Sequence, residues 1–173
     1  TTGLISKIGD DKQIAIFYTG RNHAGENIAR LYEIRDKGKA PPIQMCDALS
    51  RNTTSEFKTI LSNCMSHARR GFVEVVENFP EECRYVIEIL AKIYHIDAQA
   101  KSQNMTPDQR LSFHKDNSTG LMTDLRSWLD TQMNDHLVEP NSGLGKAINY
   151  MINHWPELTQ FLKVPGAPLD NNI

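Results

Sequence analysis

The sequence has few cysteines, no long apolar run and almost no net charge. Its three cysteines are an odd number without regular spacing, which argues against a disulfide framework and favours a reducing compartment. No apolar run approaches the ~20 residues that span a bilayer, and no signal-peptide pattern opens the chain, so we expect no membrane as partner. The net charge of −2 gives the whole chain no general affinity for nucleic acid.

What the sequence does contain is typical of a folded domain. The chain has 173 residues, of which 39% are hydrophobic and 23% charged, enough for one good-sized domain or for a core with an inserted subdomain. Its charge is uneven. Residues 1–79 carry 11 basic and 9 acidic side chains, whereas residues 80–173 carry 8 and 12. The first part is therefore the better candidate for a surface that faces a polyanion.

The first part alternates signals for strands and helices. Short runs of apolar and β-branched residues at 4–8 and 13–19 flank a turn at residues 9–11, which predicts a hairpin. Asn22 is a candidate N-cap for a helix that Gly38 would end. Apolar runs at residues 43–46 and 59–64 then predict two further strands. Ser66 is a candidate N-cap for a helix that follows the second of them.

From Pro80 onward the sequence predicts helices alone. Pro80 followed by two glutamates starts the first, and Thr106-Pro107 starts a second, shorter one. An apolar stripe over residues 121–133 indicates a third, and Asn141-Ser142 caps a fourth. We therefore predict an α/β fold in which residues 1–79 form a truncated core and residues 80–164 a helical insertion. Both ends of the sequence look cut from something longer.

Asp47 is the first candidate for chemistry. Pro41 and Pro42 disfavour helix, and the apolar run Ile43–Cys46 then predicts a buried strand that ends on Asp47. Ligands and catalytic groups of open α/β sheets gather at the carboxyl ends of strands. The alternative is that Asp47 only caps the following turn, which is a common role for aspartate.

Two other groups of side chains bear on function. A structural zinc site needs more ligands than Cys46, Cys64 and His67 provide. Nothing in the sequence places the imidazole against a thiol, as nucleophilic catalysis would require. We therefore interpret the cysteines as buried and structural. His67, Arg69 and Arg70 near a helix N-terminus would favour a phosphate backbone. The alternative is a solvated basic turn that pairs with Glu74 or Glu77.

Lys146 is a further candidate for DNA binding. It follows Ser142-Gly143-Leu144-Gly145, which resembles an anion-binding start of a helix, although the spacing matches no Walker loop. A plain surface lysine is the alternative interpretation.

Several long motifs resemble the insertion sequence 66 transposase family, and the resemblance covers nearly the whole chain in order. They are Pro42-Ile43-Gln44-Met45-Cys46-Asp47-Ala48-Leu49-Ser50-Arg51-Asn52, Asn63-Cys64-Met65-Ser66-His67-Ala68-Arg69-Arg70-Gly71-Phe72, Pro140-Asn141-Ser142-Gly143-Leu144-Gly145-Lys146-Ala147-Ile148-Asn149-Tyr150, His154-Trp155 and Pro168-Leu169-Asp170-Asn171-Asn172.

The resemblance implies a ribonuclease H-like core with a helical insertion before the last catalytic helix, to which residues 165–173 would lead. It implies a DDE triad of carboxylates that holds two Mg²⁺ or Mn²⁺ ions, with Asp47 as the second acid and metal ligand. It also implies DNA as partner, in the form of insertion-sequence ends and target, and a bacterial cytoplasmic, nucleoid-associated protein. Homo-oligomer formation is left open.

The sequence departs from this family pattern at both ends. By the resemblance, the first aspartate lies on a strand before Thr1, and the final glutamate follows beyond Ile173. Asp10 and Asp11 fall in a hairpin turn and Asp170 belongs to the Asp-Asn-Asn motif, so none of them is a substitute. We therefore expect a fragment of a transposase that is inactive alone and binds metal weakly.

Two alternatives remain open from the sequence. One is a DNA-binding or dimerisation module without chemistry, derived from the same core. The other is a ribonuclease H-like nuclease with another purpose.

Overall fold

The first part of the chain forms its strands and helix in the predicted order. The computed structural model describes residues 2–8, 12–36, 38–49, 52–53 and 57–172. Within these, the first elements are β1 (Thr2–Ile8), β2 (Lys12–Tyr18), α1 (Ala24–Glu33), β3 (Ile43–Cys46) and β4 (Ile60–Asn63). The β-β-α-β order is confirmed, while the turn expected at residues 9–11 lies outside the described residues.

β1 and β2 form an antiparallel hairpin that buries little surface. Thr2 pairs with Tyr18 at one end and Ile8 with Lys12 at the other. Phe17 remains 72% exposed although its residue type favours a packed, pleated surface. A two-stranded sheet with so little burial is marginal by itself, so its contact with α1 contributes to holding it in place.

α1 begins one residue later than the sequence predicts. His23, not Asn22, is the N-cap, because the backbone N–H of His23 donates to Oε2 of Glu26 at 2.6 Å, as in a capping box. The helix ends at Glu33, short of the stop expected at Gly38. Its inner face buries Ile28 and Ala29, among others.

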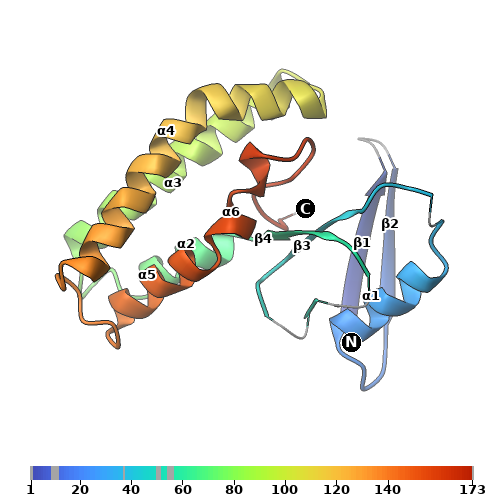
Figure 1. The fold of residues 1–173 in the computed structure, drawn as a ribbon, viewed down its shortest axis with the longest axis horizontal. Coiled ribbons are helices and arrows are strands. Elements are labelled where there is room, and N and C mark those ends of the chain that lie inside the picture. Colours follow the sequence, from blue (N-terminus) through green and yellow to red (C-terminus); the bar gives the residue numbers. More distant parts are fainter. Residues whose placement is uncertain (1, 9–11, 37, 50–51, 54–56, 173) are drawn as a thin grey trace.

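The strands form two small sheets within the described residues. β3 and β4 pair in parallel, with Ile43 opposite Ile60 and Cys46 opposite Asn63, and no ladder joins them to the hairpin. Figure 1 shows β3 and β4 between the hairpin with α1 on one side and the helices on the other. The α/β class is thus confirmed as a mixed fold with small sheets, and the ribonuclease H-like core remains a prediction.

The rest of the chain is helical, as predicted. Its elements are α2 (Met65–Val73), α3 (Pro80–Ser102), α4 (Pro107–Asn134), α5 (Gly143–Asn153), α6 (Trp155–Leu158) and the 3₁₀ helix η2 (Gln160–Leu162). α2 begins at Met65 with Cys64 as N-cap, so the cap predicted at Ser66 lies two residues too late. In the described part of the chain, no helix has an apolar stretch of the length that crossing a membrane takes.

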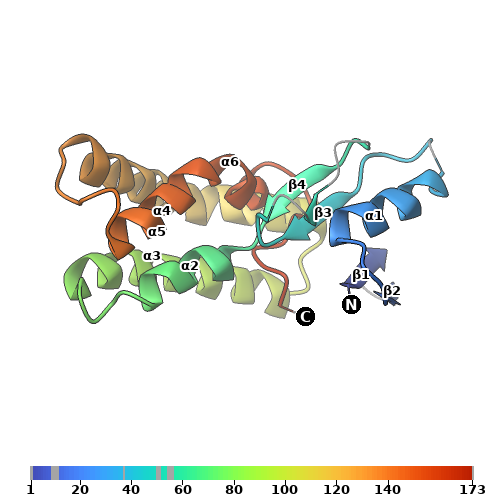
Figure 2. The same ribbon diagram turned by 90° about the horizontal axis from the view of Figure 1, so that it is seen from below.

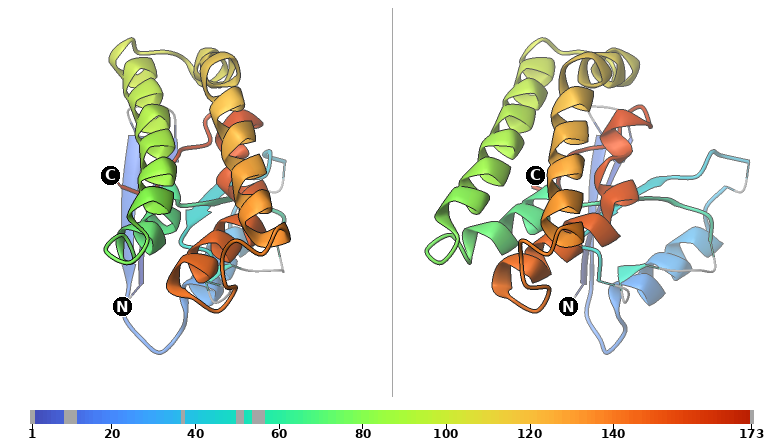
Figure 3. Two further views of the ribbon diagram at one scale, coloured as in Figure 1. Left: turned by 90° about the vertical axis from the view of Figure 1, so that its left-hand side faces the viewer. Right: turned by 60° about the vertical axis from the view of Figure 1, so that its left-hand side comes forward.

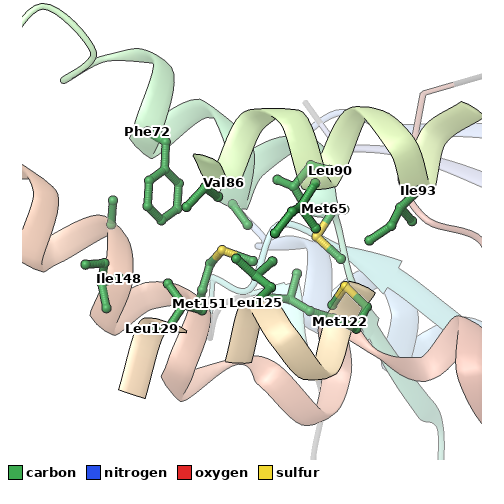
Figure 4. Close-up of a cluster of buried hydrophobic side chains, with 14 of the residues drawn as sticks. Met65, Phe72, Val86, Leu90, Ile93, Met122, Leu125, Leu129, Ile148 and Met151 are labelled. Atoms are coloured by element: carbon green, nitrogen blue, oxygen red, sulfur yellow. The ribbon is translucent and has the colours of Figure 1, made fainter. Parts of the chain in front are cut away.

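α3 and α4 pack side by side, as do α2 and α5, and Figures 2 and 3 show these pairs from further directions. The four helices share one apolar core, shown in Figure 4. Met65 and Phe72 of α2 are fully buried there beside Leu90 of α3, Leu125 of α4 and Ile148 of α5. α2 thus packs with the helices of the second part of the chain, and the boundary predicted at residue 79 remains a prediction.

α4 is one helix of 28 residues, so the prediction of a short helix followed by a separate one was wrong. The polar stretch in its first half suggested a break. Two of its polar side chains, His114 and Ser118, are buried, and they hydrogen-bond each other at 3.0 Å. His114 also lies 3.0 Å from Asp97 of α3. Because these buried polar groups hydrogen-bond one another, the inner face of α4 stays buried at His114 and Ser118 without apolar side chains, and the helix is not interrupted there.

Candidate active site

Asp47 lies at the carboxyl end of β3, as predicted. β3 and β4 run in parallel, so their carboxyl ends meet at one edge, where the N–H of Cys64 donates to the carbonyl of Cys46 at 2.8 Å. α2 starts immediately after Cys64. The edge therefore brings together Asp47, the end of β4 and the first turn of a helix.

The carboxylate of Asp47 is held on one oxygen. Its Oδ1 accepts from Nδ2 of Asn52 at 2.5 Å and, more weakly, from the N–H of Leu49 at 3.4 Å. No described residue donates to Oδ2. Ala48, which lies between Asp47 and Leu49 in the chain, has a φ of 65°, in the left-handed region that non-glycine residues rarely adopt. Asp47 thus caps a turn, as the alternative interpretation predicted, while its second oxygen has no donor in the part of the chain that the structure describes.

A side chain from α5 reaches the same loop. The hydroxyl of Tyr150 donates to the backbone carbonyl of Asp47 at 3.2 Å. Burial raises the pKa of Tyr150, and the nearby charge of Asp47 raises it further, so the phenol keeps the proton that it donates. The Asp47 loop is therefore tied to the helical part of the molecule.

A groove of about 490 Å³ runs beside Asp47, between the two sheets. One side is β1 with the loop before α1, and the other is the end of β3 from Gln44 to Asp47, with Asn52 and Asn171. Gln44 is only 7% exposed, and its Oε1 has no hydrogen-bond partner among the described residues. A buried acceptor without a partner marks a position where an incoming donor would be stabilised.

The Asp-Asn-Asn segment ends at this edge as well. Oδ1 of Asn171 accepts from the thiol of Cys64 at 3.1 Å, and the carbonyl of Leu169 accepts from the N–H of Met65 at 2.9 Å. The hydroxyl of Ser66 donates to Asp170 at 3.0 Å. The carboxylate of Asp170 therefore occupies the N-terminus of α2, where the helix dipole favours a negative charge.

This corrects the interpretation of the basic residues on α2. α2 begins at Met65 and ends at Val73. Of the three basic residues, His67 alone therefore lies in the first turn of α2, and Arg70 lies in the last. The positive charges therefore do not reinforce the N-terminus of α2. Arg69 and Arg70 are exposed, and neither forms an ion pair with Glu74, Glu77 or any other described residue. His67 is half-buried, with Nδ1 unpartnered among the described residues.

Lys146 lies in the first turn of α5 and is exposed. Ser142 caps this helix, as predicted, by accepting from the N–H of Gly145 at 2.9 Å. α5 packs closely on α2, where a Cβ on Gly71 would lie 3.2 Å from that of Ala147. Arg70 and Lys146 each precede one of these two contact residues, so two exposed cations flank the contact between the helices.

The cysteines are buried and reduced. Cys46, Cys64 and Cys83 are free thiols, and burial raises the pKa of Cys46, which makes it a poorer nucleophile at neutral pH. The sequence missed Asn52 and Tyr150 as partners of Asp47. The signal for Asn52 was its short distance from Asp47 along the chain, whereas no local pattern points from Tyr150 to a residue 103 positions away.

A family model described as "Transposase IS66 family" matches residues 5–173 of the chain. The chain belongs to the IS66 transposase family. It is also 33% identical, over 114 residues, to the uncharacterized protein y4jD of Sinorhizobium fredii (strain NBRC 101917 / NGR234). That match covers 65% of this chain and 22% of the relative, so the chain spans about a fifth of the curated protein that it matches. No solved structure matches the chain.

For an IS66 transposase, a divalent metal is the group that the family resemblance implies, and the described residues fit it only in part. Oδ2 of Asp47 is an oxygen ligand of the kind that Mg²⁺ prefers. Within the described ranges, however, no group of three or more His, Cys, Asp or Glu side chains is placed to hold a metal ion. One carboxylate does not hold a pair of divalent cations, so these residues alone do not make the metal site.

Proposed function

We propose that this chain is part of the catalytic domain of a DDE transposase that cuts and joins DNA at insertion-sequence ends, with Asp47 as the second of three catalytic acids. The observation that carries the proposal is the position of Asp47 at the carboxyl end of β3, with Oδ2 free of described donors beside a groove. Divalent cations held by such acids stabilise the attacking and leaving oxygens of phosphodiester exchange.

The path of the C-terminal segment supports this proposal. By family resemblance, the third acid is a glutamate that follows the Asp-Asn-Asn motif after a spacer of two residues. Asn171 of that motif lines the same groove as Asp47. Hydrogen bonds from Cys64 and Ser66 hold the segment at this edge, so a glutamate shortly beyond it would start from beside Asp47.

The two separate sheets support it as well. By family resemblance, the first aspartate lies on a strand that precedes Thr1. The groove has β1 on one side and β3 on the other, and in the described residues neither strand has a ladder partner on the groove side. A strand placed there would pair with both, join the two sheets and present an acid next to Asp47.

Arg69, Arg70 and Lys146, with His67 beside them, are the proposed contacts to DNA phosphates. Their exposure and the lack of ion-pair partners among the described residues leave these cations available. Cations without internal partners contribute most to the salt-dependent part of DNA binding. We place the intact protein in the bacterial cytoplasm, at the nucleoid.

The decisive experiment compares Asp47→Asn with Asp36→Asn in the full-length protein that contains this chain. Asp36 is exposed and does not line the groove, so it controls for loss of charge. We expect Mg²⁺- or Mn²⁺-dependent nicking of insertion-sequence ends to be abolished by the first change only. Full activity of Asp47→Asn would refute the proposal, and nicking by the isolated 173-residue chain would refute its predicted inactivity.

A second candidate function is a DNA-binding or dimerisation module without chemistry. The exposed Arg69 and Arg70 favour it, because they contribute to binding whether or not the acids are complete. Under this alternative, DNA binding depends on salt and on both arginines, but neither Asp47→Asn nor the removal of Mg²⁺ changes any activity of the full-length protein.

A further inference from the structure

α2 and α5 pack against each other through small residues. A Cβ on Gly71 of α2 would lie 3.2 Å from that of Ala147, and one on Gly143 of α5 would meet the side chain of Val75, just past the end of α2. The two contacts follow the chain in opposite directions, so the helices are antiparallel, as Figures 1 and 2 show. Helices that touch through such small residues lie near the lower end of the usual spacing of about 8 to 10 Å. Long side chains beside the contact can therefore meet at one ligand.

Arg70 and Lys146 lie on the exposed side of this contact. Each precedes a contact residue in the sequence, and the residues that follow the contact, Phe72 and Ile148, are fully buried in the core. Because successive residues of a helix turn by about 100°, the side chain before the contact lies on the other side from the side chain after it. Both cations are exposed, and neither forms an ion pair with a described residue. They form a cation pair, one from each helix.

Arg69 differs from Arg70 in its direction. It lies two residues before Gly71, about 200° around α2 from the contact with α5. Its charge is therefore on the far side of α2 from Lys146, although Arg69 is exposed and adjacent to Arg70 in sequence. Of the two arginines, Arg70 alone is placed to act together with Lys146.

The cation pair lies between the Asp47 loop and two acids. Tyr150, one helical turn or about 6 Å beyond Lys146, donates from its hydroxyl to the carbonyl of Asp47 at 3.2 Å. At the other end, the exposed Glu74 lies past the pair on α2, and the exposed Glu139 precedes α5. Negative charge at that end disfavours a polyanion, so the surface that favours one runs from the pair toward Asp47.

We propose that Arg70 and Lys146 together bind the backbone of the DNA strand that passes Asp47, a few phosphates from the bond that is cut. This inference rests on the proposed function. Cations from two neighbouring helices suit a ligand with regularly spaced anions, and one strand of DNA carries a phosphate every 3.4 Å or so along the axis. At about that spacing, a strand that passes Asp47 reaches the pair within about four phosphates. Arg69 takes no part in this contact.

The test measures how tightly the full-length protein binds duplexes of an insertion-sequence end that carry one methylphosphonate, a neutral phosphate analogue, at successive positions. EDTA is present, so neither divalent metal nor cutting enters the measurement. For the wild type, we expect neutralisation of one or two phosphates within about four nucleotides of the cleaved bond to weaken binding by about 3- to 5-fold. Arg70→Ala and Lys146→Ala should each weaken binding of the unmodified duplex by a similar factor and no longer respond at those positions.

Arg69→Ala is the matched control, because it removes the same charge one residue away. It should lower the affinity for the unmodified duplex and keep the full response at those phosphates. The inference is overturned if Arg70→Ala and Lys146→Ala, shown by thermal unfolding to be folded, keep that response, or if Arg69→Ala loses it as well. It is also overturned if no single phosphate near the cleaved bond matters in the wild type, which is the result expected if the cation pair binds an acidic protein surface instead.

Asp47→Asn, assayed for nicking, tests the proposed function separately. If this variant nicks normally, the catalytic role of Asp47 fails, whatever the phosphate scan shows. If it is inactive and the scan shows no dependence on Arg70 or Lys146, only the paired contact fails.

Discussion

The hydroxyl of Ser66 in α2 donates a hydrogen bond to Asp170 at 3.0 Å across a separation of 104 residues. Ser66 also lies 2.9 Å from the hydroxyl of Tyr94 in α3 and accepts from the amide of Asn172 at 3.0 Å. One small side chain therefore joins the start of α2, the middle of α3 and the C-terminal segment.

We expect Ser66→Ala to loosen the C-terminal segment. The change removes the hydrogen-bond partner of the half-buried Tyr94 hydroxyl, and one unsatisfied polar group costs about 1 to 3 kcal/mol. Asp170 loses the bond from Ser66 and keeps those from Asn172. Hydrogen exchange should speed up over residues 167–172, with a fall in the free energy of unfolding. Ser112→Ala, at an exposed position of α4, is the control, and equal exchange in both variants would contradict the role of Ser66.

Asp97 should govern the stability of the α3–α4 pair. It is 2% exposed and bonds Lys101, Arg110 and His114. Asp97→Ala leaves these groups without their acceptor, and breaking a buried ion pair in this way costs about 3 to 5 kcal/mol. Urea unfolding would measure it, with Asp124→Ala, an exposed aspartate of α4, as the control that should change little.

The contribution of Asp97 should depend on pH. Burial alone would raise the pKa of this carboxyl, but the hydrogen bonds from His114 and Lys101 and the charge of Arg110 outweigh burial and hold the pKa well below its usual range. A carboxyl whose pKa is lowered by folding stabilises the protein above its unfolded pKa of about 3.9. The stability difference between the wild type and Asp97→Asn should therefore shrink as the pH falls below about 4. A difference that grows on acidification would contradict this assignment.

Two glycines should respond to alanine with opposite signs. A Cβ on Gly145 would overlap the carbonyl oxygen of Glu139, so Gly145→Ala forces the backbone to move and should cost about 1 to 3 kcal/mol. A Cβ on Gly120 meets nothing within 4 Å, and Gly120→Ala in the middle of α4 should stabilise by about 0.5 to 1 kcal/mol. Thermal unfolding of both variants checks the signs, and a destabilised Gly120→Ala would show that this part of α4 packs differently.

Removal of Arg69 and Arg70 should weaken DNA binding in a salt-dependent way. Each phosphate contact contributes about 0.9 to the slope of log K against log salt, so the double alanine variant should lose a slope of about 2. Lys92→Ala with Lys115→Ala removes the same charge from exposed positions of α3 and α4 and is the control. An equal loss of slope in both double variants would mean that only net charge matters.

Much of the fold followed from local patterns in the sequence. The strand that ends at Asp47, the start of α3 at Pro80 and the cap of α5 at Ser142 were each confirmed, because each depends on neighbouring residues. α4 was wrongly divided because its buried face is polar where His114 lies, and hydrophobic periodicity does not detect a buried polar pair.

The sequence by itself determined the family, the α/β class and the place of Asp47 at the end of a strand. The tertiary structure decided what surrounds that residue. Tyr150 reaches Asp47 and Asp170 reaches Ser66 over separations of more than 100 residues, and no local periodicity encodes such contacts. They depend on how α5 and the C-terminal segment pack against the rest of the chain, which is settled by the fit of side chains in a shared core.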